Sequence, residues 1–406
     1  MAKEEKKAPK LRFNGYTNDW ERKKLGILIT RVKSYPLSRS VEVKKETDVK
    51  YVHYGDIHTN IADEIDKNNN LPFINEIYKE YDELKLDDVI VADASEDYKG
   101  IADAAVIISN LPYTIIAGLH TIALRPTSLI KGYFLYHIFK TENFKRFGYK
   151  IGTGLKVFGI SYNNLAKYKV YYPQEIEEQE KIIGILSNLT NSINLHERKC
   201  EELALIKKAL LQKLFPKKDE IKPEVRYKNF SDAWEQRKIS DIFTITRGQV
   251  LATTDTSEIR TKEMCFPVYS SQTKNDGLMG YYNKYLFDTA ITWTTDGANA
   301  GTVNYRKGKF YSTNVNGVLL SNEGYVSKAV AEILNTVAWR YVSRVGNPKL
   351  MNNVMAGIVI SIPSSFKEQD KISELLTDFD CLIALHQRKL EKLKQLKKFL
   401  LQNMFI

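Results

Sequence analysis

The sequence predicts an α+β protein in which one architecture occurs twice: two mixed α+β modules, each followed by a long helix, form a pseudo-two-fold internal repeat. Three observations support this prediction. A segment of 43 residues recurs 190 positions later, and this segment carries a sustained heptad pattern. The stretch before each copy alternates short apolar runs with turn-forming residues. A chain of 406 residues is long enough for several domains.

The recurring segment spans residues 173–215 and 363–405, with 19 identities and no gap. Neither copy contains a proline after its first residue, and Pro216 directly follows the first copy. Each copy is therefore expected to form one long helix. The chain should accordingly divide into module, helix, module and helix at residues 1–172, 173–216, 217–362 and 363–406.

A shorter repeat lies near the start of each module, at an offset of 214. Arg12 and Trp20 correspond to Arg226 and Trp234, and aromatic residues accompany both pairs. The tryptophans could anchor a partner subunit or fill the module core. We favour the core, because aromatic residues close to a tryptophan usually pack against it.

The expected helices carry a coiled-coil seam. Apolar residues recur in steps of four and three over residues 182–214, and the same steps run through the second copy. Polar residues interrupt both seams at equivalent positions, which are His196 and Lys207 in the first copy and His386 and Lys397 in the second. They either fix register and partner choice, or they lie at the rim of a broad interface where lysine can reach solvent. Metal binding by the histidines would need further ligands, and none is suitably spaced.

Between the helices the chain predicts short strands and a few short helices. Val89–Ala92 and Ala290–Thr294 are apolar runs bounded by turn residues, which is typical of strands. Tyr133–Phe144 and Val326–Arg344 are expected to be helical.

Composition restricts the function. Sixty basic and 49 acidic residues leave a net charge of +11, which favours an acidic partner, and nucleic acid first. No apolar run approaches the ~18–20 residues of a membrane span, and the charged N-terminal residues do not resemble a secretory signal. The three cysteines are far apart and form no CxxC, so we expect neither a disulfide framework nor a zinc site, and a cytoplasmic location.

Signals for catalysis are weak. The chain has no phosphate-binding P-loop, no HExxH and no GxSxG. Asn110-Leu111-Pro112-Tyr113 resembles a motif of adenine dimethyltransferases, but the glycine-rich cofactor loop that should precede it is missing. We therefore interpret Leu111-Pro112 as a turn and expect neither a catalytic residue nor a metal site in this chain.

The duplicated helix start carries a family resemblance. Residues 177–182 read EEQEKI and residues 367–372 read KEQDKI, which resembles the conserved-region signature of type I restriction-modification specificity (S) subunits. The order of two variable domains, each followed by a long helix, is similar as well. Further matches to recognition-domain motifs lie at residues 54–58, 92–98 and 294–303.

This resemblance implies a DNA-binding subunit that does no chemistry. Each variable domain would be a target-recognition domain that reads one half of a bipartite DNA sequence. Two methyltransferase subunits would bind to this chain, and restriction subunits that translocate DNA would join them. The chain itself would hold no cofactor, since S-adenosylmethionine, ATP and Mg belong to the partners. It would not contact a membrane.

Candidate DNA contacts follow from the expected loops. Lys and Arg suit phosphates, Gln and Asn suit the adenine edge, and Lys349 suits guanine or phosphate. Asp296-Gly297 could also be a simple turn, and Tyr54 could belong to the core. The candidates are Tyr54, His58, Ser95, Tyr98, Lys99 and Lys156 in the first module, and Ser271, Gln272, Lys274, Thr295, Asn299 and Lys349 in the second.

The two helices are expected to pair antiparallel, so that their length sets the spacer between the half-sites. The seam of residues 182–214 would extend about 50 Å. That length is about one and a half turns of DNA. The alternatives are a coiled-coil scaffold without a DNA role and, on the motif at Asn110, an adenine methyltransferase.

Overall fold

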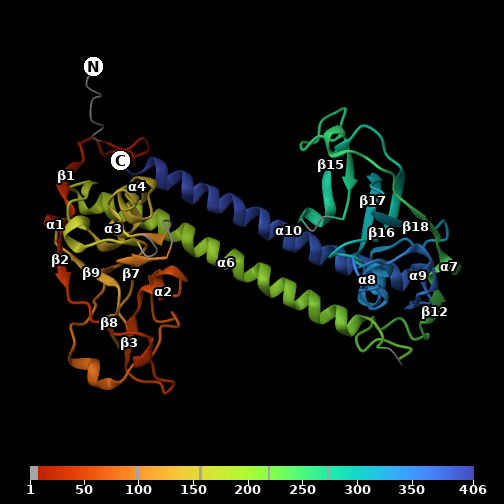
Figure 1. Ribbon diagram of the computed structural model, residues 1–406, viewed down its shortest axis with the longest axis horizontal. Coiled ribbons are helices and arrows are strands. Elements are labelled where there is room, and N and C mark those ends of the chain that lie inside the picture. The colour runs from red at the N-terminus through yellow and green to blue at the C-terminus, as the bar shows by residue number, and fades with distance from the viewer. Residues whose placement is uncertain (1–7, 97–99, 155–157, 218–219, 272–273) are drawn as a thin grey trace. The chain divides into compact units, whose positions relative to one another are not determined.

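The computed structural model describes residues 8–96, 100–154, 158–217, 220–271 and 274–406 (Figure 1). It divides into two compact units. The first comprises residues 1–195 with 389–406, and the second comprises residues 196–388. Each unit therefore holds one module together with part of both long helices. The segment boundaries expected at 172/173, 216/217 and 362/363 stay a prediction.

The two long helices are α6 (Ile176–Leu214) and α10 (Phe366–Asn403). In the first unit the beginning of α6, with Ile182 and Leu186, shares a core with Leu400 and Met404 at the end of α10. In the second unit the end of α6 shares a core with the beginning of α10. Because the start of one helix meets the end of the other in both units, the helices run antiparallel, as predicted.

The first module is built on a five-stranded sheet of order β2-β9-β5-β7-β4. Its strands are β2 (Ile29–Val32), β4 (Glu64–Ile65), β5 (Val89–Ala92), β7 (Ala104–Ile107) and β9 (Thr121–Pro126). Three small pairs accompany it: β1 (Glu21–Lys24) with β11 (Lys169–Tyr172), β3 (Val49–Val52) with β8 (Thr114–Ala117), and β6 (Ala94–Ser95) with β10 (Phe158–Gly159). The helices are α1 (Leu25–Leu28), α2 (Tyr54–His58), α3 (Gly132–Phe139), α4 (Glu142–Ile151) and α5 (Tyr162–Leu165).

The second module has a six-stranded sheet of order β13-β18-β16-β17-β14-β15. Its strands are β13 (Thr244–Arg247), β14 (Phe266–Tyr269), β15 (Leu278–Tyr282), β16 (Phe287–Thr294), β17 (Val303–Ser312) and β18 (Asn316–Leu320). A separate pair joins β12 (Glu235–Lys238) to β19 (Val359–Ile362). The helices are α7 (Ile239–Ile242), α8 (Lys328–Ala338) and α9 (Asn352–Gly357), and short 3₁₀ turns include η5 (Lys274–Gly277) and η6 (Trp339–Tyr341).

The two modules share one strand topology, which the sequence did not reveal. In β2-β9-β5-β7-β4 the first three pairings are antiparallel and the fourth is parallel. The first five strands of the second sheet, β13-β18-β16-β17-β14, repeat this pattern in the same chain order. The second module adds β15 at the edge. The duplication therefore extends through the modules as well as the helices.

Two expected helices are interrupted. The span predicted at 133–144 forms α3 and then α4, with Thr141 between them as the cap that accepts the backbone N–H of Phe144. The span predicted at 326–344 ends its regular helix at Ala338 and continues as η6. Periodicity alone does not detect such breaks, because both sides of the break face the same core.

A buried ion pair joins each module to a long helix. Arg12 donates two hydrogen bonds to the Glu178 carboxylate, at 2.7 and 2.8 Å, and the Trp20 indole N–H lies 3.4 Å from the same group. In the second unit Arg226 and Trp234 make the same contacts with Glu368. Both tryptophans are only 4% exposed, so the core interpretation is confirmed.

The glutamine that follows each buried glutamate completes the junction. The Gln179 side-chain amide donates to the carbonyls of Pro173 and Leu129, and its oxygen accepts the Lys131 N–H. Gln369 donates in the same way to the carbonyl of Gly324. The repeated Glu-Gln pair in the helix signature is thus explained by contacts within each unit.

The polar seam residues are paired. His196 and His386 face each other, with their Nδ1 atoms 2.7 Å apart. The Lys207 ammonium binds Asp380 at 2.6 Å, and the Lys397 ammonium donates to the Thr190 hydroxyl at 2.7 Å.

These seam contacts extend into the modules. Thr190 and Asp380 are equivalent positions of the repeat, and each also contacts its module, through Glu64 and Lys328 respectively. Burial lowers the pKa of Lys397, whereas Lys207 and Lys328 hold the pKa of Asp380 below its ordinary value in spite of burial. Specific partners of this kind favour the register interpretation over the rim interpretation.

Substitution of the buried glutamate should be costly. Glu178→Ala leaves the Arg12 guanidinium, only 14% exposed, without its anion. We expect the free energy of unfolding to fall by about 3 kcal/mol or more, as is usual when one partner of a buried pair is removed. Urea denaturation measures this loss. Glu177→Ala, at an exposed position of the same helical turn, is the control and should change the free energy by less than about 0.5 kcal/mol. Equal effects of the two substitutions would contradict this account.

Candidate nucleic-acid interface

The predicted reading loops occupy equivalent places in the two modules. One loop connects β5 to β7 and carries Ser95, and the other connects β16 to β17 and carries Thr295 and Asn299. Each loop pairs with a segment that follows the module's large helices. Ser95 lies opposite Phe158 in the β6–β10 pair, and Asp296 forms a bridge with Lys349. The shared strand topology therefore brings candidates from distant parts of the sequence to one edge of each sheet.

In the first module, three predicted residues line one cavity. Tyr54, His58 and Ser95 border a space of about 670 Å³, together with two cations that the sequence analysis missed, Arg39 and Lys145. Glu96 and Asp103 also line it. The cavity thus combines an aromatic ring, polar side chains and charges of both signs.

Helix α2 positions two of these residues. At its start the His53 Nδ1 accepts the Gly55 N–H, and the Asp56 carboxylate accepts the His53 N–H, which forms a capping box. At its end the His58 Nε2 lies 2.8 Å from the Ala94 carbonyl, which links α2 to β6.

The Tyr54 ring lies among three histidines, with ring centroids 4.5 Å from His53, 5.8 Å from His58 and 5.3 Å from His120. Burial, assisted by the Arg39 charge, lowers the pKa of His53, which keeps this ring neutral as a hydrogen-bond acceptor. Tyr54 is half-buried and lines the cavity. It therefore lies at the predicted site, and it is also partly packed, as the alternative of a core residue had suggested.

The second module presents a small polar cavity of about 130 Å³ at the corresponding end of β16 and β17. Asn299 lines this cavity, and its side-chain amide donates to the Ser271 carbonyl at 3.1 Å. The structure therefore brings these two predicted residues together. Further polar residues from the sheet complete the lining: Thr292, Thr294, Asn304, Arg306 and Asn316.

Arg306 is the most unusual of these residues. It is only 7% exposed and lies over the Tyr269 ring, 3.8 Å from its centroid. Its guanidinium donates to the Asp276 carbonyl at 2.5 Å and to the Thr292 hydroxyl at 3.3 Å. Burial lowers its pKa from the ordinary value.

This polar face has a signal in the sequence that the predicted site residues did not include. At the end of β16 and the start of β17 polar residues alternate with apolar ones: Thr292, Thr294, Asn304 and Arg306 are polar, whereas Ile291, Trp293 and Val303 belong to the core. Alternation with period two assigns the polar side chains to one face of the sheet. Farther along the strands the same face carries a small apolar cluster with Ala290, Phe310 and Val318, so the polar signal is confined to the end near Asn299.

The remaining candidates are differently placed. Lys349 is exposed, and its ammonium lies 4.0 Å from the Asp296 carboxylate. Ser95 and Thr295 are each 4% exposed, and the Thr295 hydroxyl donates to the Val315 carbonyl. Thr295 therefore supports the loop from inside. Tyr98, Lys99, Lys156 and Gln272 lie outside the described residues, and Lys274 begins η5, where its side chain is not described.

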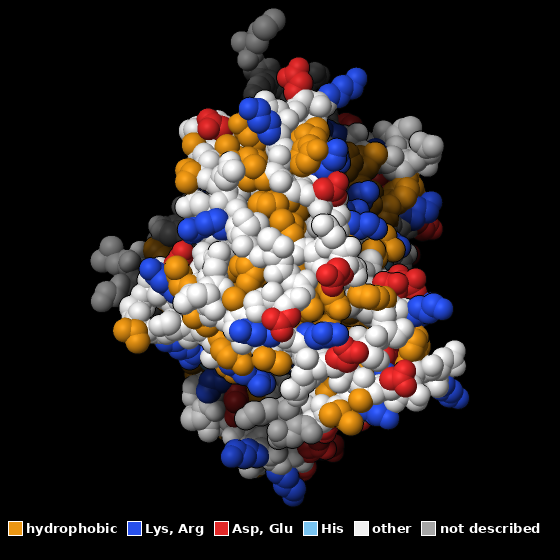
Figure 2. All heavy atoms as spheres, turned by 90° about the vertical axis from the view of Figure 1, so that its right-hand side faces the viewer, with side chains coloured by type: hydrophobic (Ala, Val, Ile, Leu, Met, Phe, Trp, Pro, Cys, Tyr) orange, Lys and Arg blue, Asp and Glu red, His pale blue; other side chains and the backbone are white. Residues whose placement is uncertain are grey.

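Positive charge is spread over the face of the molecule shown in Figure 2. On the face shown in Figure 2, lysine and arginine side chains are interspersed with acidic and apolar ones. The net charge of +11 is therefore not gathered into one basic patch on that face. Among the described residues, no three or more His, Cys, Asp or Glu side chains are placed to hold a metal ion, and no helix has the length and apolar character needed to cross a membrane.

Comparison with known proteins identifies the family. The model described as the type I restriction modification DNA specificity domain matches residues 17–205 and 231–395. The chain belongs to this family of type I restriction-modification specificity subunits, and its main function is DNA recognition. This excludes the alternative of a scaffold without a DNA role.

Proteins similar to this chain in sequence or in fold are specificity subunits of the same kind. In Mycoplasma pneumoniae, the type I specificity subunit S.MpnORF615P is 34% identical over 222 residues, which are 54% of this chain and 83% of that protein. The specificity subunit of restriction enzyme MpnII from the same organism is 37% identical over 152 residues, 37% of this chain and 44% of that protein. The crystal structure of a type I S subunit from M. genitalium has the same fold, with a TM-score of 0.71 over 98% of this chain and 99% of that chain at 15% identity.

Proposed function

We propose that this chain reads a bipartite DNA sequence, one half-site per module, and that it leaves all catalysis to its partners. The observation that carries this proposal is the pair of matched edges: the same five-strand frame presents two chemically different surfaces. Because the frame is the same, both surfaces can approach DNA in a similar way. Because the side chains differ, the two half-sites should differ in sequence.

The contacts divide by chemistry. Lys145 in the first module and Lys349 in the second suit phosphate oxygens, which position a protein without selecting bases. The Arg39 guanidinium is held by the Glu42 and Asp56 carboxylates and shapes the cavity wall instead. Asn299 in the second module suits the adenine edge through its amide group. Tyr54 offers an aromatic edge, and His58, whose Nε2 lies at the Ala94 carbonyl, supports the loop that carries Ser95. The predicted residues outside the described ranges remain part of the proposal as loop contacts.

Catalysis and its cofactors belong to partner subunits in this proposal. S-adenosylmethionine, ATP and Mg would be bound there, and the specificity subunit would hold none. The methyltransferase-like motif at Asn110 supports this division, because its Tyr113 ring packs against Lys50 and its hydroxyl donates to the Asp66 carbonyl. A tyrosine held in this way is not free to stack on a target base.

The outer faces of the long helices are proposed to dock two methyltransferase subunits, with the restriction subunits joining that core. Leu195 is 55% exposed and its equivalent Leu385 is 61% exposed; Ile206 and Leu396, another equivalent pair, are 48% and 44% exposed. Exposed apolar residues repeated at the same positions indicate protein contacts rather than chance. Their duplication suits a partner that is present twice.

The central test is a methylome comparison. Methylated adenines are mapped in the host strain with and without this chain. We expect one bipartite motif to lose its methylation when the chain is absent. An unchanged methylome would overturn the proposed function.

Exchange of one module should change half of the target. Replacing residues 20–170 with the corresponding module of another specificity subunit should alter one half of the methylated motif and leave the other half and the spacer unchanged. Alteration of both halves would show that the modules do not read independently. The reciprocal exchange of residues 234–360 is the matched control and should alter the opposite half.

Substitutions of single residues should distinguish contacts to DNA phosphates from contacts to DNA bases. Lys145→Ala and Lys349→Ala should each lower the slope of log affinity against log salt by about one, with little change in sequence preference. Asn299→Ala should weaken the second half-site by about 1–3 kcal/mol and relax its preference at one base pair. DNA titrations at several salt concentrations measure both effects. Lys228→Ala, exposed near the start of the second module, is the control and should change neither.

Helix length should set the spacer. His196 faces His386, so residues 197–203 of α6 face residues 379–385 of α10 in the antiparallel pair. Deleting both segments removes one heptad from each helix, or about 10 Å, and retains the histidine pair. We expect the preferred spacer to shorten by about three base pairs, at about 3.4 Å per base pair. Methylome mapping reads the new spacer, and an unchanged spacer would refute the ruler hypothesis.

A further inference from the structure

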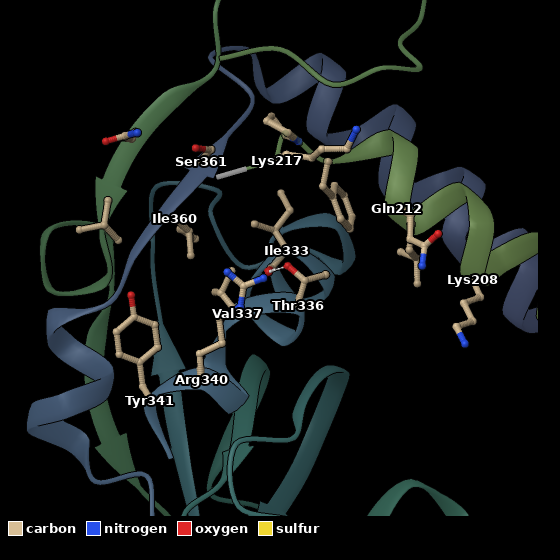
Figure 3. Close-up of a pocket in the computed structure, with 15 residues that line it drawn as sticks. Lys208, Gln212, Lys217, Ile333, Thr336, Val337, Arg340, Tyr341, Ile360 and Ser361 are labelled. Carbon is tan, nitrogen blue, oxygen red and sulfur yellow. Dashed lines mark hydrogen bonds between the residues drawn. The ribbon is translucent and has the colours of Figure 1, made fainter. Parts of the chain in front are cut away.

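Each unit has a cavity between the end of a long helix and a helix of the module. The cavity in the second unit has a volume of about 570 Å³ and is shown in Figure 3. It is lined by Leu211 and Gln212 of α6 and by Phe215 just after this helix, and also by Thr336 and Val337 of α8 and Arg340 of η6. The cavity in the first unit, of about 200 Å³, is lined by Leu401, Gln402 and Phe405 of the α10 end and by Thr141, Glu142 and Arg146 of α4 and its cap.

The two cavities are equivalent positions of the repeat. Leu211, Gln212 and Phe215 correspond to Leu401, Gln402 and Phe405 at the offset of 190, and all three residue types are identical. The opposite walls correspond as well. Gln179 binds the Leu129 carbonyl and Gln369 binds that of Gly324, which aligns the modules at an offset of 195. At this offset Thr141 of the first module corresponds to Thr336 of the second.

The cavities have an apolar floor and an exposed rim. Phe215 and Phe405 are each 7% exposed, whereas Gln212 and Gln402 are exposed. In the larger cavity two further apolar lining residues are exposed, Tyr341 at 46% and Val359 at 49%. An apolar floor with an exposed aromatic side chain at its rim is typical of a site that receives an anchoring side chain from another protein.

The larger cavity is also electropositive. Its charged lining residues are Lys208, Lys217 and Arg340, and no acidic side chain lines it within the part of the chain that the structure describes. Lys208 and Arg340 are exposed, whereas Lys217 lies 4.0 Å from Glu220. In Figure 3, Lys208 and Gln212 lie on the α6 side of the cavity, and Arg340 lies with Thr336 and Val337 on the opposite side. A complementary occupant would bring an apolar anchor flanked by carboxylates.

We propose that the two cavities bind the same apolar anchor from each of two copies of the methyltransferase subunit, and that acidic residues next to this anchor meet the cations of the larger cavity. The smaller cavity has charges of both signs, Glu142 and Arg146, so there the apolar anchor and the identical helix residues carry the proposal. This inference rests on the proposed function, in which the chain holds two such subunits. A cavity repeated with identical helix residues matches a partner that is present twice. DNA is the less suitable occupant, because it offers phosphates for the cations but no anchor for the apolar floor.

The position of the larger cavity connects this partner to DNA reading. Arg340 and Tyr341 stand immediately before the segment in which Ser343 bridges Lys349, and Lys349 in turn bridges Asp296 of the reading loop. An occupant that contacts Arg340 therefore lies a few residues from the edge proposed to contact DNA. The methyltransferase would be held close to the half-site that the module reads.

Cross-linking tests the shared occupant. A photo-crosslinking amino acid is placed at Gln212 or, separately, at Gln402 of the full chain, and each variant is co-purified with the methyltransferase subunit of the same system. Mass spectrometry identifies the captured peptides. We expect both positions to capture the same segment, containing an apolar residue next to Asp or Glu. The exposed position Lys262 is the control and should not capture that segment.

Several results would overturn the proposal. These are capture of different segments from the two positions, capture of DNA alone, or no capture while two methyltransferase subunits remain bound. If the unaltered chain binds no methyltransferase, the proposed function fails together with this inference.

Charge reversal provides an independent measurement. Lys208→Glu combined with Arg340→Glu changes two exposed side chains of the larger cavity and should weaken one of the two binding events at least tenfold. Native mass spectrometry should then show one bound subunit at concentrations where the unaltered chain binds two. Lys262→Glu is the matched control and should retain two. Unchanged binding of both subunits by the double variant would refute the electropositive cavity as their site.

Discussion

Two buried carboxylates, Glu178 and Glu368, hold the rest of the structure in place. Each accepts two hydrogen bonds from an arginine and lies beside a tryptophan indole, at the point where a module meets the start of a long helix. A buried ion pair adds little net stability over an apolar contact, but it is intolerant of misplacement, because either charge alone in the interior is costly. Each pair therefore constrains how its module meets the start of its long helix. The adjacent Gln179 and Gln369 fix the same junction through backbone carbonyls.

A fixed junction allows the rest of each module to vary. The strand pair β1–β11 and its equivalent β12–β19 keep the same antiparallel form, and the five-strand topology recurs. The modules differ in their loops, in the added strand β15 and in the cavities beside their reading loops. In the first module the cavity has a volume of about 670 Å³ and is lined by Tyr54 and by loop residues, and in the second it has about 130 Å³ and is lined by polar sheet residues that include Arg306. A constant frame with replaceable surfaces is what a protein needs if it must recognise two different sequences from one architecture.

The seam lysines show how the helix pair and the modules are coupled. Lys207 and Lys397 occupy equivalent positions, and each binds the residue at the equivalent position of the facing helix, Asp380 or Thr190. The chemistry differs, since one contact is an ion pair and the other a hydrogen bond to a hydroxyl. Each of these partners also contacts its own module, so the helix register and the module position depend on one another within each unit. At the centre of the repeat, the pair of His196 and His386 joins two copies of the same residue.

The sequence by itself determined the duplication and the heptad seam, because repetition and periodicity are read directly from the order of the residues. The antiparallel pairing of the helices and the burial of Trp20 and Trp234 were hypotheses at that stage, and the tertiary structure confirmed them. The sequence also indicated the family through the Glu-Gln signature. It did not reveal the common strand topology, because strand pairing depends on long-range contacts that diverged side chains no longer record. It missed Arg39, Lys145 and Arg306, whose surroundings are assembled from segments far apart in the chain. Only the tertiary structure decided that Thr295 supports its loop from inside, and that Asn299, Ser271 and the alternating polar residues of β16 and β17 meet at one edge.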